Sequence, residues 1–186
     1  MMDSRTARNN HPHPTRVRGL YLGLLAGLTL LLVPLNPIGA VPIEHDARDF
    51  EGIPWGATFE ESATFHKVED TGRLKAYELV GITPTLGTVP VDSMRFYTAK
   101  ERFARVAVRY HGKPAHETIM KYLENRYGEL DRTPGQIAMG PVRFHNWHGE
   151  ETDVTLRYKI HDEEGVIFFE SQVWAPQLNE GAPAGF

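Results

Sequence analysis

The sequence contains no cysteine, which removes thiol catalysis, thiolate metal sites and disulfide bonds from the chemistry available to it. Beyond residue 40, serine occurs only at Ser62, Ser93 and Ser171, none of which lies in a Gly-x-Ser-x-Gly or Ser-x-x-Lys pattern. There is also no glycine-rich phosphate-binding motif. These absences argue against a nucleotide-dependent or covalent catalyst and favour a binding domain.

A hydrophobic run long enough to cross a membrane is also lacking. The apolar run from Gly19 to Val33 has about 15 residues, and a transmembrane helix needs ~20. Four arginines precede the run, two prolines follow it, and Ile38-Gly39-Ala40 matches a signal peptidase site. We therefore predict that residues 1–40 are a signal peptide that exports the rest of the chain to the periplasm or the medium. If the segment is retained, it would anchor an exported domain in the inner membrane.

Positive charge is scarce in the exported part. Residues 1–40 hold four of the 20 basic residues and one of the 24 acidic residues, so the remaining 146 residues carry a net charge of −7. That sign opposes binding to nucleic acid or to an anionic membrane surface. The length suits one domain. We predict a lead-in over residues 41–49, a single domain over residues 50–174 and a flexible tail over residues 175–186 that is rich in proline and glycine.

Local signals predict two helices. Thr58 and Glu61 form a capping box, which indicates a helix over residues 59–67. A second helix is expected from Pro114 to Tyr127, where a proline suits the first turn and apolar residues recur at helical spacing. Gly128 follows at the position where a helix commonly ends on glycine.

Alternation of apolar and polar residues predicts six strands. They comprise a strand from Leu74 to Val80, a hairpin from Val91 to Tyr110 and three strands over residues 141–147, 154–161 and 166–173. The expected fold class is α+β, with an antiparallel sheet of about five to six strands and two helices packed on one face.

Aromatic residues supply the candidate binding site. The run from Val166 to Phe169 puts apolar groups on both faces of one strand, so either protein covers both faces or one face binds a ligand. We predict aromatic contacts from Trp55, Tyr97, Trp147 and Phe169. The expected function is a non-catalytic binding domain for a protein partner or an apolar small ligand, without a cofactor.

Two alternatives remain open. His145, His148 and Glu151 lie close together in an acidic segment, which suggests a metal-binding protein or a metal-assisted hydrolase. Because residues three apart on a strand point to opposite faces, a shared ion would require a loop or bulge between the two histidines. The other alternative is an envelope accessory or structural protein that binds no small ligand.

A short motif near the start of the domain carries a resemblance. Phe50-x-Gly52-Ile53-x-Trp55-Gly56 precedes the first predicted helix, and Tyr127-Gly128 ends the second. This order resembles small bacterial exported proteins of unknown function, which open with F-x-G-I-x-W-G and carry Tyr-Gly at the end of a helix. The resemblance covers most of residues 50–174. It implies structural roles for these residues and no activity or catalytic residues.

Overall fold

The computed structural model describes residues 40–46, 48–130 and 136–179. The predicted signal peptide, apart from Ala40, lies outside the described residues, as do residues 180–186 of the predicted tail. Within the described part of the chain, no helix is long and apolar enough to cross a membrane.

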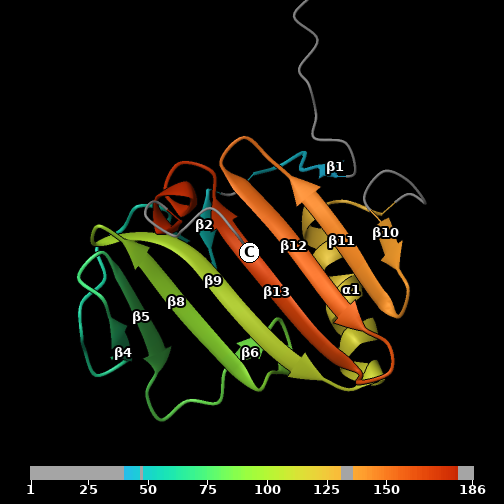
Figure 1. Ribbon diagram of the computed structural model, residues 1–186, viewed down its shortest axis with the longest axis horizontal. Coiled ribbons are helices and arrows are strands. Elements are labelled where there is room, and N and C mark those ends of the chain that lie inside the picture. Colours follow the sequence, from blue (N-terminus) through green and yellow to red (C-terminus); the bar gives the residue numbers. More distant parts are fainter. Residues whose placement is uncertain (1–39, 47, 131–135, 180–186) are drawn as a thin grey trace, which may run out of the picture. The chain divides into compact units, whose positions relative to one another are not determined.

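A nine-stranded sheet dominates the fold (Figure 1). Its order is β1–β11–β12–β13–β9–β8–β5–β4, and β10 pairs with β11 next to β1. All pairs are antiparallel except β1 with β11. The strands are β1 (Val41–Pro42), β4 (Phe65–Asp70), β5 (Leu74–Leu79), β8 (Ser93–Ala99), β9 (Arg102–His111), β10 (Gln136–Met139), β11 (Val142–His148), β12 (Thr152–Lys159) and β13 (Glu164–Ser171).

Two four-stranded meanders make up most of this sheet. The first runs β4–β5–β8–β9 and the second β10–β11–β12–β13, and the last strands of the two pair with each other at the centre. The helix α1 (Lys113–Tyr127) connects the meanders. Two small hairpins lie outside the sheet: β2 (Asp49–Phe50) with β3 (Ile53–Pro54), and β6 (Thr85–Leu86) with β7 (Val89–Pro90).

The predicted fold class is wrong. The described residues contain one α-helix and a nine-stranded sheet of mixed direction, so the fold is mostly β. The helix expected over residues 59–67 does not form. Ser62 Oγ instead accepts hydrogen bonds from the backbone N–H groups of Thr64 and Phe65 (3.2 and 3.1 Å), and Phe65 begins strand β4. Such bonds compete with a helix, and this segment has no apolar stripe of helical period to stabilise one by packing.

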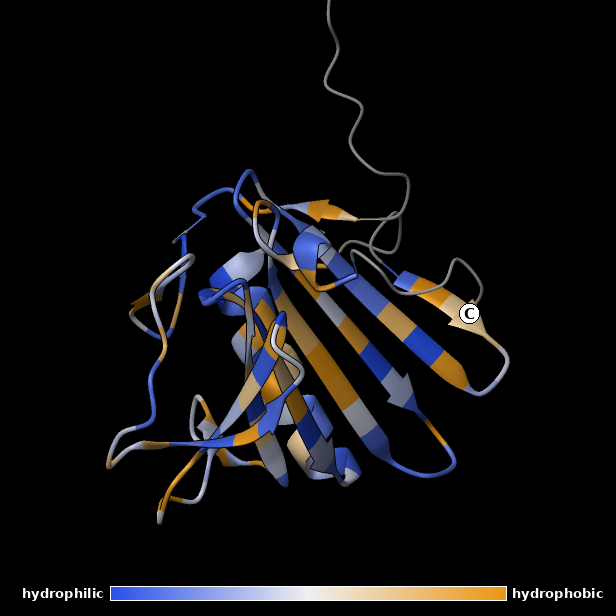
Figure 2. Ribbon diagram, turned by 60° about the vertical axis from the view of Figure 1, so that its left-hand side comes forward, coloured by the Kyte–Doolittle hydropathy of each residue, from blue (hydrophilic) through white to orange (hydrophobic). Residues whose placement is uncertain are grey.

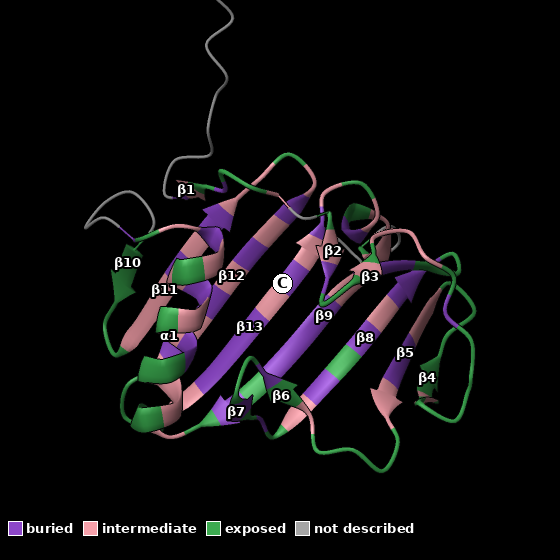
Figure 3. Ribbon diagram, turned by 180° about the vertical axis from the view of Figure 1, so that it is seen from behind, coloured by how far each residue is buried: buried purple, intermediate pink, exposed green. Residues whose placement is uncertain are grey.

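The second predicted helix and the predicted hairpin are confirmed. In α1, Ile119, Leu123 and Tyr127 are buried against the sheet, as their spacing indicates. Figure 3 shows α1 crossing the β11–β13 side of the sheet. Trp147 on β11 donates its indole N–H to the Gly128 carbonyl at 2.8 Å, which fixes the end of the helix to the sheet.

The sheet has two unequal faces. We call the side that α1 covers the inner face; its side chains, such as Val106, Val154 and Ile167, are fully buried. The side chains between them in sequence form the outer face. Figure 2 shows this alternation as successive orange and blue bands along the long strands. A short 3-10 helix, η1 (Ala175–Leu178), contacts β8 and β9 and lies within the predicted tail.

Candidate functional site

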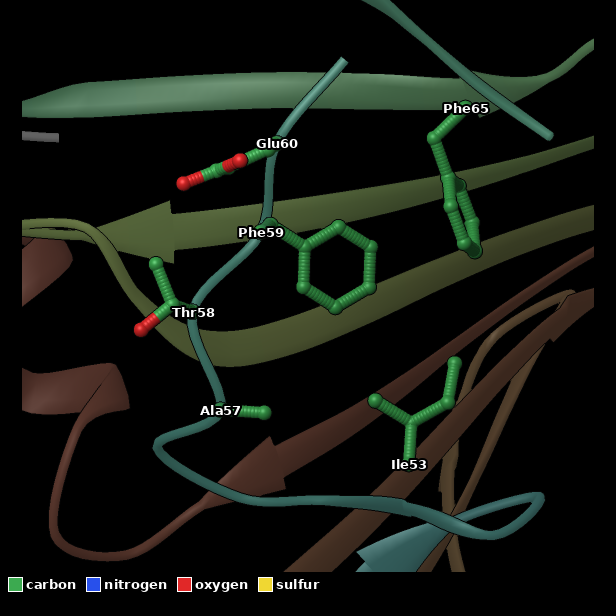
Figure 4. Close-up of a pocket in the computed structure, with 6 residues that line it drawn as sticks. All are labelled: Ile53, Ala57, Thr58, Phe59, Glu60 and Phe65. Atoms are coloured by element: carbon green, nitrogen blue, oxygen red, sulfur yellow. The ribbon is translucent and has the colours of Figure 1, made fainter. Parts of the chain in front are cut away.

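An apolar pocket opens where the β2–β3 hairpin meets the β4 edge of the sheet. Its volume is about 270 Å³, and it is lined by Ile53, Ala57, Thr58, Phe59, Glu60 and Phe65. In Figure 4 the side chains of Ile53, Phe59 and Phe65 converge on one space, and those of Thr58 and Glu60 point away from it. The walls that face this space are therefore aliphatic and aromatic.

Backbone hydrogen bonds to strand β9 hold one wall of this apolar pocket in place. Gly56 N–H donates to the Phe103 carbonyl, and Phe103 N–H donates to the Ala57 carbonyl, both at 2.8 Å. Thr58 forms an isolated bridge to Arg102 at the start of β9. The segment from Gly56 to Thr58 is thus fixed to a central strand although it is irregular.

Aromatic rings form the interior side of the pocket. Phe59 is 6% exposed, and its ring centroid lies 4.8 Å from that of Phe65 and 5.0 Å from that of Phe103. Phe96 stacks on Phe59 at 5.7 Å, and Tyr77 donates its hydroxyl to the Phe59 carbonyl at 3.3 Å. A ligand in the pocket would therefore rest against a continuous aromatic cluster rather than a mobile loop.

The structure does not bring the four predicted aromatic contacts together. Trp147 and Phe169 are each 1% exposed and belong to the core. Tyr97 is half-buried on the outer face. Trp55 is half-buried, stacks on Phe103 at 4.8 Å and donates its indole N–H to Thr152 Oγ1 at 2.9 Å.

Trp55 connects to the apolar pocket through Phe103 and then Phe59. Phe169 reaches the pocket less directly, through Phe50 and Phe96. Sequence reasoning missed the pocket residues themselves. The sequence feature that lies closest to them along the chain is the aromatic motif that contains Ile53 and Trp55. Phe59 was assigned to a helix, and the partner strand that carries Phe65 was not foreseen.

The histidines of the predicted metal site lie on opposite faces of β11. His145 is 7% exposed on the inner face, and His148 pairs on the outer face with Asp153 (Nδ1 to Oδ1, 2.6 Å). Glu151 lies in the turn after β11, where its backbone N–H donates to Asp46. Among the described residues, no group of three or more histidine, aspartate or glutamate side chains is arranged to hold a metal ion.

A cluster of histidine and tyrosine side chains lies between the first turn of α1 and the inner face of the sheet. The ring of His116 stacks on Tyr158 at 3.7 Å, and its Nδ1 shares a hydrogen bond of 2.7 Å with the Tyr110 hydroxyl. The His145 ring lies 6.2 Å from that of His116, and its Nδ1 has no hydrogen-bond partner among the described residues. Tyr110 itself is fully buried, and its ring lies against Gly165.

Burial decides the protonation of this cluster. It lowers the pKa of His116 to about 4. Burial, with the nearby His116 and Arg143, lowers the pKa of His145 to about 4. Burial also raises the pKa of Tyr110. All three groups are uncharged near neutral pH, so they pack as polar core residues.

Comparison with known proteins provides no assignment, because the chain matches no family model, no curated protein and no solved structure.

Proposed function

We propose that this chain is an exported, non-catalytic binding domain whose apolar pocket takes a small apolar ligand. The observation that supports this proposal is the convergence of Ile53, Phe59 and Phe65 around a space of about 270 Å³. Small-molecule sites are typically concave and apolar, with volumes from about 300 Å³ upward. At about 270 Å³, this pocket lies just below that range.

The pocket volume indicates the size of the ligand. A cavity of about 150 Å³ with apolar walls holds benzene. A pocket of about 270 Å³ therefore suits a fused bicyclic ring or a short alkyl chain. Because Thr58 and Glu60 point away, recognition would depend on shape and on removal of apolar surface from water.

Filling the pocket tests the proposal. The neutral fluorescent bicyclic probe 1-naphthylamine would be titrated into the full chain and into the variant Ala57→Phe. Ala57 contributes a methyl group to the wall, so a phenyl ring in its place would occupy the ligand's space. We expect at least a tenfold loss of affinity in this variant. Thermal unfolding would check that it remains folded.

A matched control separates the pocket from other apolar surface. Ile82 is 57% exposed and lies outside the pocket lining, so Ile82→Phe should bind the probe as the wild type does. The apolar segment near the N-terminus is present in all three proteins and contributes the same background. Equal binding by the wild type and Ala57→Phe would refute the proposal.

A further inference from the structure

A second pocket lies on the outer face, beside η1. Its volume is about 360 Å³, and its lining includes Arg105, Asp153, Glu170, Gln172 and Asn179. Unlike the apolar pocket, it has five ionic or amide side chains among its eight lining residues, the others being Ser171, Ala175 and Pro176. We call it the polar pocket.

The pairing of neighbouring strands places the residues of the pocket floor side by side. Asp153 on β12 lies opposite Glu170 on β13, and Glu170 lies opposite Arg105 on β9. The same row continues from Arg105 to Tyr97 on β8. Side chains directly opposite on neighbouring strands have Cβ atoms about 5 Å apart. Four residues from four strands therefore form one continuous row across the rigid centre of the sheet.

The charges in the pocket are compensated by neighbours. Arg105 places Nε and Nη2 at 2.6 and 2.5 Å from Glu170 Oε1. Asp153 Oδ1 pairs with His148 Nδ1 at 2.6 Å and accepts a bond from the Gln172 amide at 3.2 Å. An ionic ligand would have to compete with these pairs. The two carboxylates against one arginine also disfavour an anion.

Considerable hydrogen-bonding capacity remains after these pairs form. Within the described residues, the bonds above use one oxygen of each carboxylate, which leaves the second oxygen of Glu170 and of Asp153 as acceptors. A guanidinium has five N–H donors, and only part of this set on Arg105 faces Glu170. The Gln172 side chain donates through its nitrogen and keeps its oxygen as an acceptor. Donors and acceptors thus lie around one space.

We infer that the polar pocket binds a neutral polyhydroxylated ligand, a sugar ring. A hydroxyl group both donates and accepts, so it matches a lining that contains carboxylate, amide and guanidinium groups together. Along the floor, the carboxylates of Asp153 and Glu170 are followed by the Arg105 guanidinium. This order of groups suits neighbouring hydroxyls on one sugar ring. The volume of about 360 Å³ has room for one ring or a small part of a glycan.

An aromatic surface adjoins the same row. The Arg105 guanidinium lies 5.6 Å from the centroid of the Phe168 ring, and Tyr97 is half-buried next to Arg105. The Phe168 ring thus lies beneath Arg105 and holds the guanidinium in place next to the pocket. Tyr97 was predicted as a ligand contact; it lies opposite Arg105 in the strand pairing but lines neither pocket.

The test uses the full chain and isothermal titration with defined probes: glucose, galactose, N-acetylglucosamine and the β-1,4-linked trimer of N-acetylglucosamine. We expect saturable binding of at least one of them. Glu170→Gln should weaken that binding at least tenfold, because it disrupts the Arg105 pair and removes an acceptor. Gln172→Ala, whose side chain is less embedded in the sheet, should also weaken it.

A matched control lies on the same face. Arg95 and Glu78 form an equivalent ion pair (Nε to Oε1, 2.6 Å) outside the polar pocket, so Glu78→Gln should leave sugar binding unchanged. Ala57→Phe should also leave it unchanged, which keeps this test independent of the apolar pocket.

Each outcome has a defined meaning. Tighter binding of the trimer than of the monomer would identify a unit within a glycan as the ligand, and equal affinities would identify a free sugar. The absence of saturable binding to all four probes would overturn the inference. So would sugar binding that survives both Glu170→Gln and Gln172→Ala. In a parallel titration with sodium sulfate, tighter binding of sulfate than of every sugar would also overturn it.

Discussion

Acidification from pH 7 to 5.5 should destabilise this domain through two buried imidazoles. His145 is 7% exposed, and burial, with His116 and Arg143 nearby, lowers its pKa to about 4. Burial lowers the pKa of His116 to about 4 as well. Both rings therefore stay neutral in the folded protein at pH 5.5, whereas a histidine in the unfolded chain gains a proton near pH ~6.5. The unfolded state binds more protons, so the free energy of unfolding falls as the pH falls.

The magnitude follows from proton linkage. The stabilisation is fully present above about pH 6.5 and is lost progressively down to about pH 4. For His145 alone, the loss between pH 7 and 5.5 is about 1.2 kcal/mol. His116 is only half-buried, so solvent screening reduces its share. We expect a loss of about 2 kcal/mol for the pair, which lowers the melting temperature by about 4–8 °C in a chain of this size.

Thermal unfolding followed by circular dichroism would measure this loss in the wild type, His145→Gln and the control His161→Gln, whose imidazole is exposed. The interval from pH 7 to 5.5 lies above the pH at which carboxyl groups with lowered pKa, such as those of Asp46 and Glu164, gain protons. His145→Gln should remove about half of the pH dependence, and His161→Gln none of it. A flat wild-type melting temperature from pH 7 to 5.5, or full pH dependence in His145→Gln, would refute the reasoning.

Three further substitutions test the packing by urea denaturation. Trp147→Phe removes the indole donor to the Gly128 carbonyl and should cost about 1–2 kcal/mol; an unchanged midpoint would show that this bond does not hold the helix end. Gly165→Ala should cost about 1–3 kcal/mol or more, because the Tyr110 ring occupies the position of the new methyl group. Asp46→Ala should cost about 2 kcal/mol at pH 7, since the carboxylate accepts three hydrogen bonds at the start of β12. Burial opposes ionisation of Asp46, but these bonds outweigh it and lower its pKa, so its contribution is present above the unfolded pKa and shrinks as the pH falls through the folded value.

The elements that the sequence predicts well are those with complete local signals. Helix α1 combines a proline in its first turn, an apolar stripe and Gly128 at its end, and all three signals agree. The helix expected after Thr58 had a capping box alone. The segment forms a strand instead, because Phe65 pairs opposite Leu79 on β5. The residues next to Phe65 in the sequence carry no signal of that pairing.

The candidate sites were less predictable because both depend on contacts between distant residues. Aromatic content alone cannot distinguish Trp147, fully buried in the core, from Tyr97, half-buried on the outer face. The floor of the polar pocket is set by the pairing of β9, β13 and β12, which places Arg105 beside Glu170 and Glu170 beside Asp153. Each strand shows its own alternation, but the register between strands is a property of the whole sheet.

The register also explains the apolar residues that β13 shows on its outer face. Val166 is only 2% exposed there, although α1 lies on the other side. Its cross-strand neighbours are Arg157 and Arg109. The aliphatic stem of an arginine can cover apolar surface while its charged end stays in water, which accounts for the burial of Val166. Phe168 lies beneath the Arg105 guanidinium in the same way. An exposed ion pair contributes only about 0–1 kcal/mol, so a largely exposed arginine such as Arg109 matters chiefly as a cover for apolar surface. The charged and polar groups above that surface form a face that a polar ligand can approach.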